Sequence, residues 1–194
     1  MPRVRRFVLL ALLLASLGPL AALASTGLPG PLAEREHLRK VGGGQLSWLG
    51  MDIYDASLWT DTGRYEGFVA GRTVALSLWY QRSFSRDQLL GITSTAWKKL
   101  GRDPASSERW LAELRGLWSD VRPGDNVTTV VEAGGATSFY DESRYLGRVD
   151  DPAFGPAFLA IWLDPRSVVG DLRVQLLGGE PRGGTDPSTS RGAQ

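Results

Sequence analysis

Residues 73–82 alternate regularly between apolar side chains and smaller or polar ones, and this pattern constrains the fold more than any other in the chain. Successive side chains of a strand point to opposite faces, so one face would carry an apolar row that ends in a cation: Val74, Leu76, Leu78, Tyr80 and Arg82. We therefore predict a strand over 73–82 whose apolar face must be covered by another layer of structure.

A helix is predicted directly after this strand. Ser85 and Gln88 have the spacing of a capping box, in which each side chain bonds a backbone N–H of the other residue. Apolar residues then recur at helical spacing until Gly101, which favours the end of a helix. Asp103 and Pro104 are typical of the start of a second helix.

The remaining elements are predicted to be strands followed by helices. The stretch 45–60 is predicted to form two strands or one long bent strand, and Gly42–Gly44 before it is interpreted as a flexible entry turn. A hairpin is predicted over 127–132 and 137–140, with a short third strand over 144–148. Two closing helices are predicted over 151–162 and 167–177. This order predicts an α+β fold, with an antiparallel sheet that carries helices mainly on one face.

The N-terminus has the pattern of an export signal. Three arginines within residues 1–6 precede an uncharged apolar run that ends in Ala22-Leu23-Ala24. We expect cleavage after Ala24 and a periplasmic or secreted protein; the alternative is an uncleaved membrane anchor. The predicted organisation is a signal peptide (1–24), a lead-in segment (25–37), one domain (38–178) and a disordered tail (179–194).

Composition excludes several kinds of chemistry. The 22 basic side chains include the three arginines of the signal, so the mature chain is close to neutral and shows no basic patch for nucleic acid. The chain has no cysteine and one histidine, His37, which lies in a charged stretch and is interpreted as a surface residue. Thiol nucleophiles, disulfides and metal sites built from several His or Cys ligands are therefore excluded, and no cofactor is expected.

A set of short motifs carries a resemblance to a known family. They are Met51–Leu58 between two tryptophans, Tyr80–Ser85, Asp120–Asp125, Phe139-Tyr140, and Asp151–Phe154 leading to Ile161–Leu163. In this order the motifs resemble the bacterial, exported branch of the chalcone isomerase-like proteins, over about residues 38–178. The resemblance implies an open-faced β-sandwich, in which a large antiparallel sheet is covered by a layer of helices, with a cleft for an apolar ligand between them.

The reactive groups that the resemblance implies are largely missing. Plant enzymes of the family close a flavanone ring, which requires a cation near the phenolate and hydrogen-bond donors at the developing enolate oxygen. Near the position of the family arginine this chain offers Arg39 or Lys40, and Ile53 falls close to the position of a strand threonine. The helix after Ser85 lacks the family's tyrosine and asparagine, and its hydroxyl residues 93–95 are expected to bond solvent or the preceding turn. We therefore predict no catalytic residues.

Four residues are candidates for ligand binding: Arg82, Tyr80, Tyr54 and Arg39. An arginine at the end of an apolar row suits a carboxylate with a hydrocarbon body. In the structural alternative, Arg82 ends the strand and pairs with Asp52, Asp55 or Asp87, and Tyr54 is a core residue with a bonded hydroxyl.

Three functions are compatible with these features. The first is a non-catalytic periplasmic binder of a small apolar or acyl ligand, since related non-catalytic proteins of the family bind fatty acids. The second is a cofactor-independent isomerase that acts on a chalcone-like or enone substrate. The third is an envelope interaction module that exposes aromatics such as Trp59 or Trp79. An open apolar cleft between strand 73–82 and helix 85–101, with one buried cation, would favour the first.

Overall fold

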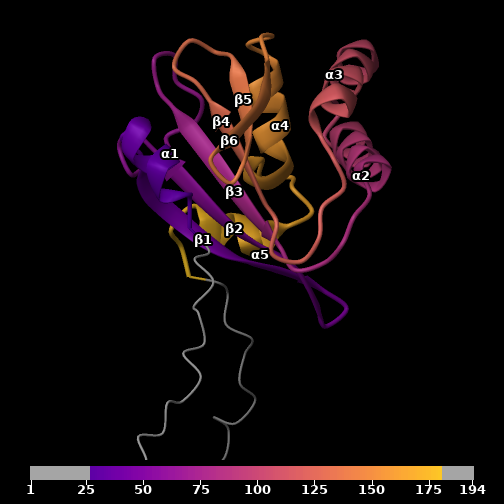
Figure 1. Cartoon of the computed structure of the whole chain (residues 1–194), viewed down its shortest axis with the longest axis horizontal. Helices are drawn as coiled ribbons and strands as arrows, with labels where there is room; N and C mark the ends of the chain where they lie inside the picture. Colours follow the sequence, from indigo (N-terminus) through magenta and orange to yellow (C-terminus); the bar gives the residue numbers. More distant parts are fainter. Residues whose placement is uncertain (1–26, 181–194) are drawn as a thin grey trace, which may run out of the picture.

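The computed structural model describes residues 27–180 as a sheet with helices on both faces (Figure 1). The predicted export signal and residues 181–194 of the predicted tail lie outside the described residues. The sheet has six strands in the order β1-β2-β3-β4-β5-β6, and every neighbouring pair is antiparallel. Its strands are β1 (Arg39–Trp48), β2 (Met51–Thr60), β3 (Val74–Tyr80), β4 (Asn126–Val131), β5 (Thr137–Asp141) and β6 (Arg144–Val149). The predicted α+β architecture with an antiparallel sheet is confirmed.

Strand β1 begins earlier than the sequence pattern indicated. Gly42–Gly44 belongs to this strand, so the predicted entry turn is wrong. The physical reason is the helix α5 (Gly170–Leu176), which packs on β1: a Cβ atom at Gly42 would lie 2.2 Å from the carbonyl oxygen of Gln175. Glycine here allows the two backbones to approach.

The long helices follow their capping signals. Helix α2 (Arg86–Lys99) begins with the predicted capping box: Gln88 N donates to Ser85 Oγ at 3.2 Å, and Ser85 N donates to Gln88 Oε1 at 2.8 Å. Helix α3 (Pro104–Leu117) is capped by the Asp103 carboxylate, which accepts from Ser106 N at 2.8 Å. Figure 1 shows α2 and α3 as a pair beside α4 (Phe154–Leu163).

The predicted lead-in contains a short helix, α1 (Gly30–Arg35), which the sequence analysis missed. It was not predicted because Gly30 and the prolines on both sides of it are residues that disfavour a helix. Leu32 on this helix packs with Leu28 and Leu38 against the outer face of the sheet, where Arg35 Nη2 donates to the Tyr140 hydroxyl at 2.6 Å. The lead-in is therefore folded onto the domain.

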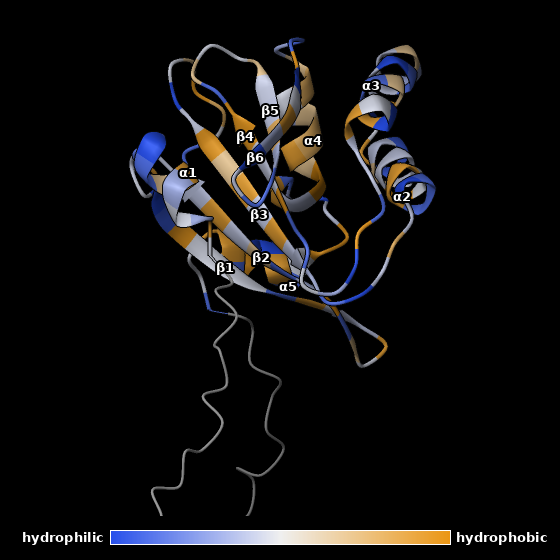
Figure 2. Cartoon of the chain, viewed as in Figure 1, coloured by the Kyte–Doolittle hydropathy of each residue, from blue (hydrophilic) through white to orange (hydrophobic). Residues whose placement is uncertain are grey.

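The main core lies between the other face of the sheet and helices α2 to α5. Its centre is a group of edge-to-face aromatic side chains: Trp97, Trp110, Phe139, Phe154 and Phe158. Figure 2 shows apolar residues along the central strands and along α4. Between residues 27 and 180, none of the helices is both long and apolar enough to cross a bilayer.

Candidate ligand-binding cleft

A cleft of about 1050 Å³ lies between the helix-covered face of the sheet, α2 and α4. Strands β2, β3 and β4 supply its floor, with Tyr54, Leu78, Tyr80 and Val127. These residues share one face because Tyr54 is paired with Tyr80 and Leu78 with Val127 across neighbouring strands. The period-2 pattern of 73–82 therefore placed the apolar row correctly up to Tyr80.

The walls of the cleft are mainly apolar side chains from two helices. Leu89, Ile92 and Ala96 line it from α2, and Ile161 and Trp162 line it from α4. The cleft is thus open and apolar, and tryptophans do not fill it.

Two threonines of α2 also line the cleft, and their hydroxyl groups already donate hydrogen bonds to backbone carbonyls of the same helix. Thr93 Oγ1 donates to the Leu89 carbonyl at 2.9 Å, and Thr95 Oγ1 donates to the Gly91 carbonyl at 2.8 Å. Hydroxyls on a helix commonly bond the preceding turn in this way. These groups are therefore poor donors to a reacting oxygen.

The polar centre of the cleft is a pair of tyrosines. The rings of Tyr54 and Tyr80 meet edge to face, with centroids 6.0 Å apart, and Trp162 Nε1 donates to the Tyr54 hydroxyl at 2.9 Å. Among residues 27–180 the Tyr80 hydroxyl has no hydrogen-bond partner, although the residue is only 7% exposed. Both hydroxyls retain a proton that could be donated to a ligand oxygen.

Burial keeps both tyrosines neutral. It raises the pKa of Tyr54 to about 12, an increase that the hydrogen bond from Trp162 partly offsets. Burial also raises the pKa of Tyr80, and the nearby Tyr54 adds to this increase. Because the unfavourable form of a buried phenol is the charged one, both side chains are donors rather than bases at neutral pH.

The two candidate arginines do not line the cleft. Strand β3 ends at Tyr80, and Arg82 lies exposed beyond it. No described carboxylate forms an ion pair with Arg82: Asp55 accepts from Gln81 Nε2 at 2.7 Å, and Asp87 pairs with Arg115 at 2.7 Å.

Arg39 is also exposed and lies at the far end of β1. It is paired with Thr60, whereas the cleft begins near the Leu46–Tyr54 pair. Of the four sequence candidates, the structure therefore brings together Tyr54 and Tyr80.

Two cations that the sequence analysis did not select line the cleft. They are Lys99, at the end of α2, and Arg144, at the start of β6; both are exposed. Arg144 donates to the Asp141 carboxylate at 2.5 Å, so its charge is already paired. The buried cation expected beside the apolar row is not found among the described residues.

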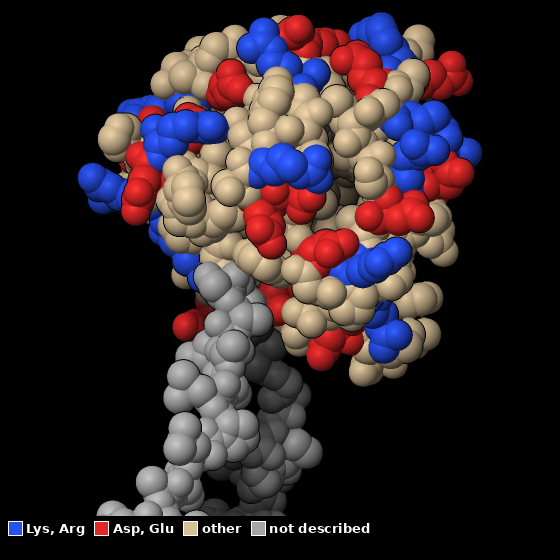
Figure 3. Space-filling model, in the orientation of Figure 1, with Lys and Arg blue, Asp and Glu red and all other residues tan. Residues whose placement is uncertain are grey.

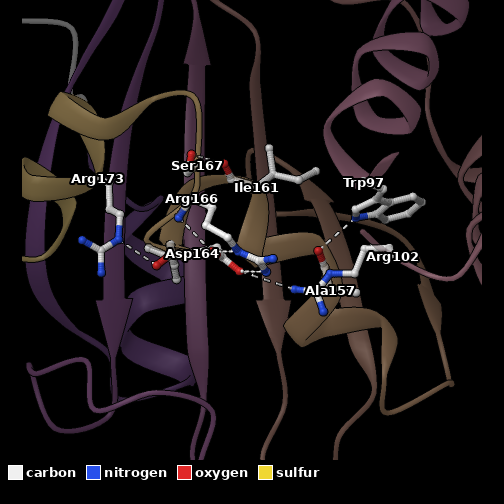
Figure 4. A network of polar contacts seen from close by, with 9 residues as sticks. Trp97, Arg102, Ala157, Ile161, Asp164, Arg166, Ser167 and Arg173 are labelled. Atoms are coloured by element: carbon white, nitrogen blue, oxygen red, sulfur yellow. Dashed lines mark hydrogen bonds and ion pairs between the residues drawn. The ribbon is translucent and has the colours of Figure 1, made fainter. Parts of the chain in front are cut away.

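Helix α4 is held in place by polar contacts near both of its ends (Figure 4). Asp164 accepts hydrogen bonds from Arg166, and Arg173 Nε donates to the Leu163 carbonyl at 2.9 Å. Trp97 Nε1 donates to the Ala157 carbonyl at 2.9 Å and joins α4 to α2. These contacts position the cleft wall formed by Ile161 and Trp162.

Trp59 and Trp79, suggested above as exposed interaction residues, are half-buried. Trp59 Nε1 donates to Ser57 Oγ at 2.9 Å, and Trp79 Nε1 donates to the Gly27 carbonyl at 2.7 Å. The exposed tryptophan is Trp48 at the β1–β2 turn. In the described part of the chain, no cluster of three or more His, Cys, Asp and Glu side chains is arranged to hold a metal ion.

Comparisons with known proteins agree with this architecture. Among solved structures, the crystal structure of a fatty-acid binding protein from Arabidopsis thaliana is similar, with a TM-score of 0.56 and 14% sequence identity; the match covers 72% of this chain and 86% of that chain. At this identity the likeness shows the fold alone. No curated protein matches the chain. A family model described as chalcone isomerase-like matches residues 33–178, most of the sequence. The chain therefore belongs to the chalcone isomerase-like family, as its motifs indicated.

Proposed function

We propose that this protein is a non-catalytic binder of a small apolar or acyl ligand. The observation that carries the proposal is the cleft of about 1050 Å³, which is lined mainly by apolar side chains and contains the neutral Tyr54–Tyr80 pair. This volume is slightly above the range of roughly 300–1,000 Å³ that is usual for small-molecule sites. The similar fold of a fatty-acid binding protein supports the same ligand class.

The distribution of polar groups favours binding over catalysis. Ring closure of a chalcone-like substrate moves negative charge between two oxygens, so it needs a cation and free donors at defined places. Among the described residues that line the cleft, the two cations, Lys99 and Arg144, are exposed, and the tyrosine pair is neutral. The Thr93 and Thr95 hydroxyls are bonded to their own helix. An enone carbonyl could accept a hydrogen bond from Tyr80, which keeps an isomerase as the second candidate.

We also propose that the protein is exported and that it belongs to a bacterial branch of the family. The apolar run at residues 7–24 and its Ala22-Leu23-Ala24 end support export to the periplasm, in a bacterial branch of the family. Intact mass measurement of protein isolated from a periplasmic fraction should give a chain that begins at Ser25. A mass that includes residues 1–24 would contradict this part.

Ligand binding can be tested on the purified protein. We expect native mass spectrometry to show bound acyl molecules after expression, and we expect added C12–C16 acyl compounds to raise the melting temperature. The absorbance of a chalcone should stay unchanged in the presence of the protein. An empty protein with an unaltered melting temperature would refute the binding proposal, and rapid loss of chalcone absorbance would establish the isomerase instead.

A further inference from the structure

The charges around the cleft restrict which polar end a ligand can carry. The titratable side chains that line it are Tyr54, Tyr80, Lys99, Asp120, Asp125, Asp141 and Arg144. Three of the seven are carboxylates, and the two cations are exposed. In the described residues, no cation stands beside the tyrosine pair at the floor of the cleft.

All three carboxylates already accept hydrogen bonds from neighbouring groups of the protein, Asp141 from Arg144. Asp120 Oδ1 accepts from Arg86 N at 2.8 Å, and Asp125 Oδ2 accepts from Arg122 N at 2.8 Å. Because Arg144 neutralises Asp141, the remaining charge around the cleft is two carboxylates against Lys99.

The available donors are neutral. The Tyr80 hydroxyl has no described partner, and Tyr54 keeps its proton while it accepts from Trp162. Trp118, another lining residue, has an indole N–H that is shielded from solvent and has no hydrogen-bond partner in the described part of the chain. Neutral donors satisfy a carbonyl or hydroxyl oxygen well, whereas a buried carboxylate also needs a countercharge.

From these observations we infer that the cleft takes acyl or alkyl ligands whose polar end is uncharged, such as an ester, an alcohol or a protonated acid, and that it discriminates against the ionised carboxylate. The inference rests on the proposed function and narrows its ligand class. Figure 3 shows charges of both signs interspersed over the visible face of the molecule, so no broad positive field on that face would attract an anionic ligand.

The test compares dodecanoic acid with methyl dodecanoate on the full-length protein, by calorimetric titration at pH 8 and pH 5. At pH 8 the acid should bind more weakly than the ester by at least about tenfold, because the buried anion has no partner. Lowering the pH should raise the apparent affinity for the acid by about tenfold per unit, in proportion to its protonated fraction, and leave the ester unaffected.

Single substitutions locate the polar end. Tyr80→Phe removes one neutral donor and should weaken ester binding by roughly threefold to tenfold, as expected for one hydrogen bond. Tyr145→Phe changes an exposed tyrosine outside the cleft and is the matched control; it should leave the affinity for the ester unchanged. Lys99→Ala tests whether this exposed cation pairs with the ligand, and it should not weaken binding of the acid relative to the ester.

The outcomes separate the two proposals. If the acid binds at pH 8 as tightly as the ester, or if Lys99→Ala weakens the acid selectively, the inference is overturned and the binding function stands. Binding of neither compound would refute the binding function itself. Tyr80→Phe and Tyr145→Phe with equal ester affinities would remove the tyrosine pair from the polar subsite.

Discussion

Two buried threonines on neighbouring strands differ in what their hydroxyls bond. Thr128 Oγ1, on β4, lies 3.0 Å from Ser77 Oγ and 3.0 Å from Asn126 Oδ1. Among residues 27–180, Thr137 Oγ1 on β5 has no hydrogen-bond partner, and it is shielded from solvent. It lies under α4, where a Cβ atom at Gly155 would be 2.6 Å from it. An unpaired buried hydroxyl costs stability, because its hydration is lost without replacement.

We expect Thr137→Val to raise the free energy of unfolding by about 1 kcal/mol, since valine has nearly the same shape and removes the unpaired oxygen. Thr128→Val is the matched control and should lower it by about 1–3 kcal/mol, because Ser77 and Asn126 then lose a partner. Urea unfolding of the two variants measures both changes. Equal destabilisation by the two substitutions would show that the Thr137 hydroxyl is bonded in solution.

Single residues also show where prediction from sequence ends. Alternation placed Tyr80 on the cleft face, because that signal is local. The same alternation extended the row to Arg82, but the last β2–β3 pair is Tyr54 with Tyr80, and the chain then turns away. Lys99 and Arg144 come from elements far apart in the sequence, so their place beside the cleft depends on tertiary packing.

Among the secondary-structure elements, α4 is followed by a turn that is held by the Asp164 carboxylate (Figure 4). Asp164 accepts two side-chain hydrogen bonds from Arg166, at 3.0 and 2.9 Å, and one from Arg166 N at 2.8 Å. These bonds, the Arg166 guanidinium first, lower the pKa of Asp164 to about 2, and Arg102 contributes a weaker attraction. The ionised form of Asp164 is therefore favoured in the folded state.

This shift predicts a loss of stability in acid. A carboxyl whose pKa is lower in the folded state stabilises the fold above its unfolded pKa of about 4 and loses that contribution as the pH falls towards 2. We expect about 1 kcal/mol from Asp164, reduced by solvent screening because Arg166 is exposed. In chemical unfolding at pH 6 and pH 2.5, Asp164→Asn should lose correspondingly less stability than the wild type.

Arg166→Gln removes the main cause of the lowered Asp164 pKa. It should therefore also reduce the part of the free energy of unfolding that is lost between pH 6 and pH 2.5. A parallel loss of stability in Asp164→Asn and the wild type would contradict the assignment. The wild type and both variants retain a second acid-sensitive group, Asp151, whose pKa is lowered by hydrogen bonds from the Ala153 N–H and Trp110 Nε1. Some loss of stability in acid should therefore remain in every variant.

Elements with local signals were predicted well. Short sequence patterns predict the capping box of α2, the Asp103 cap of α3 and the β4–β5 hairpin. The start of β1 was missed because its glycines serve a contact with α5, and α1 was missed because its stability comes from packing on the outer face of the sheet. Such elements depend on partners that sequence periodicity does not reveal.

Helices α2 and α4 contact each other, and both contribute side chains to the wall of the cleft. Trp97 of α2 joins the two helices, with its indole bonded to the Ala157 carbonyl of α4 and its ring fully buried. Beyond it, α2 presents the small side chain of Ala96 to the cleft. The volume available to a ligand therefore depends on small residues at this wall as much as on the apolar floor.

We expect Ala96→Phe to fill part of the cleft and to abolish ligand binding while the fold persists, because Ala96 is half-buried and faces open space. A ligand at 100 times its dissociation constant stabilises a protein by about 2.7 kcal/mol, or roughly 5–10 °C for a domain of this size. Ala96→Phe should lose this shift in a thermal scan with methyl dodecanoate. Ala112→Phe, on an exposed position of α3, should keep it. An equal shift in both variants would mean that the ligand binds elsewhere on the molecule.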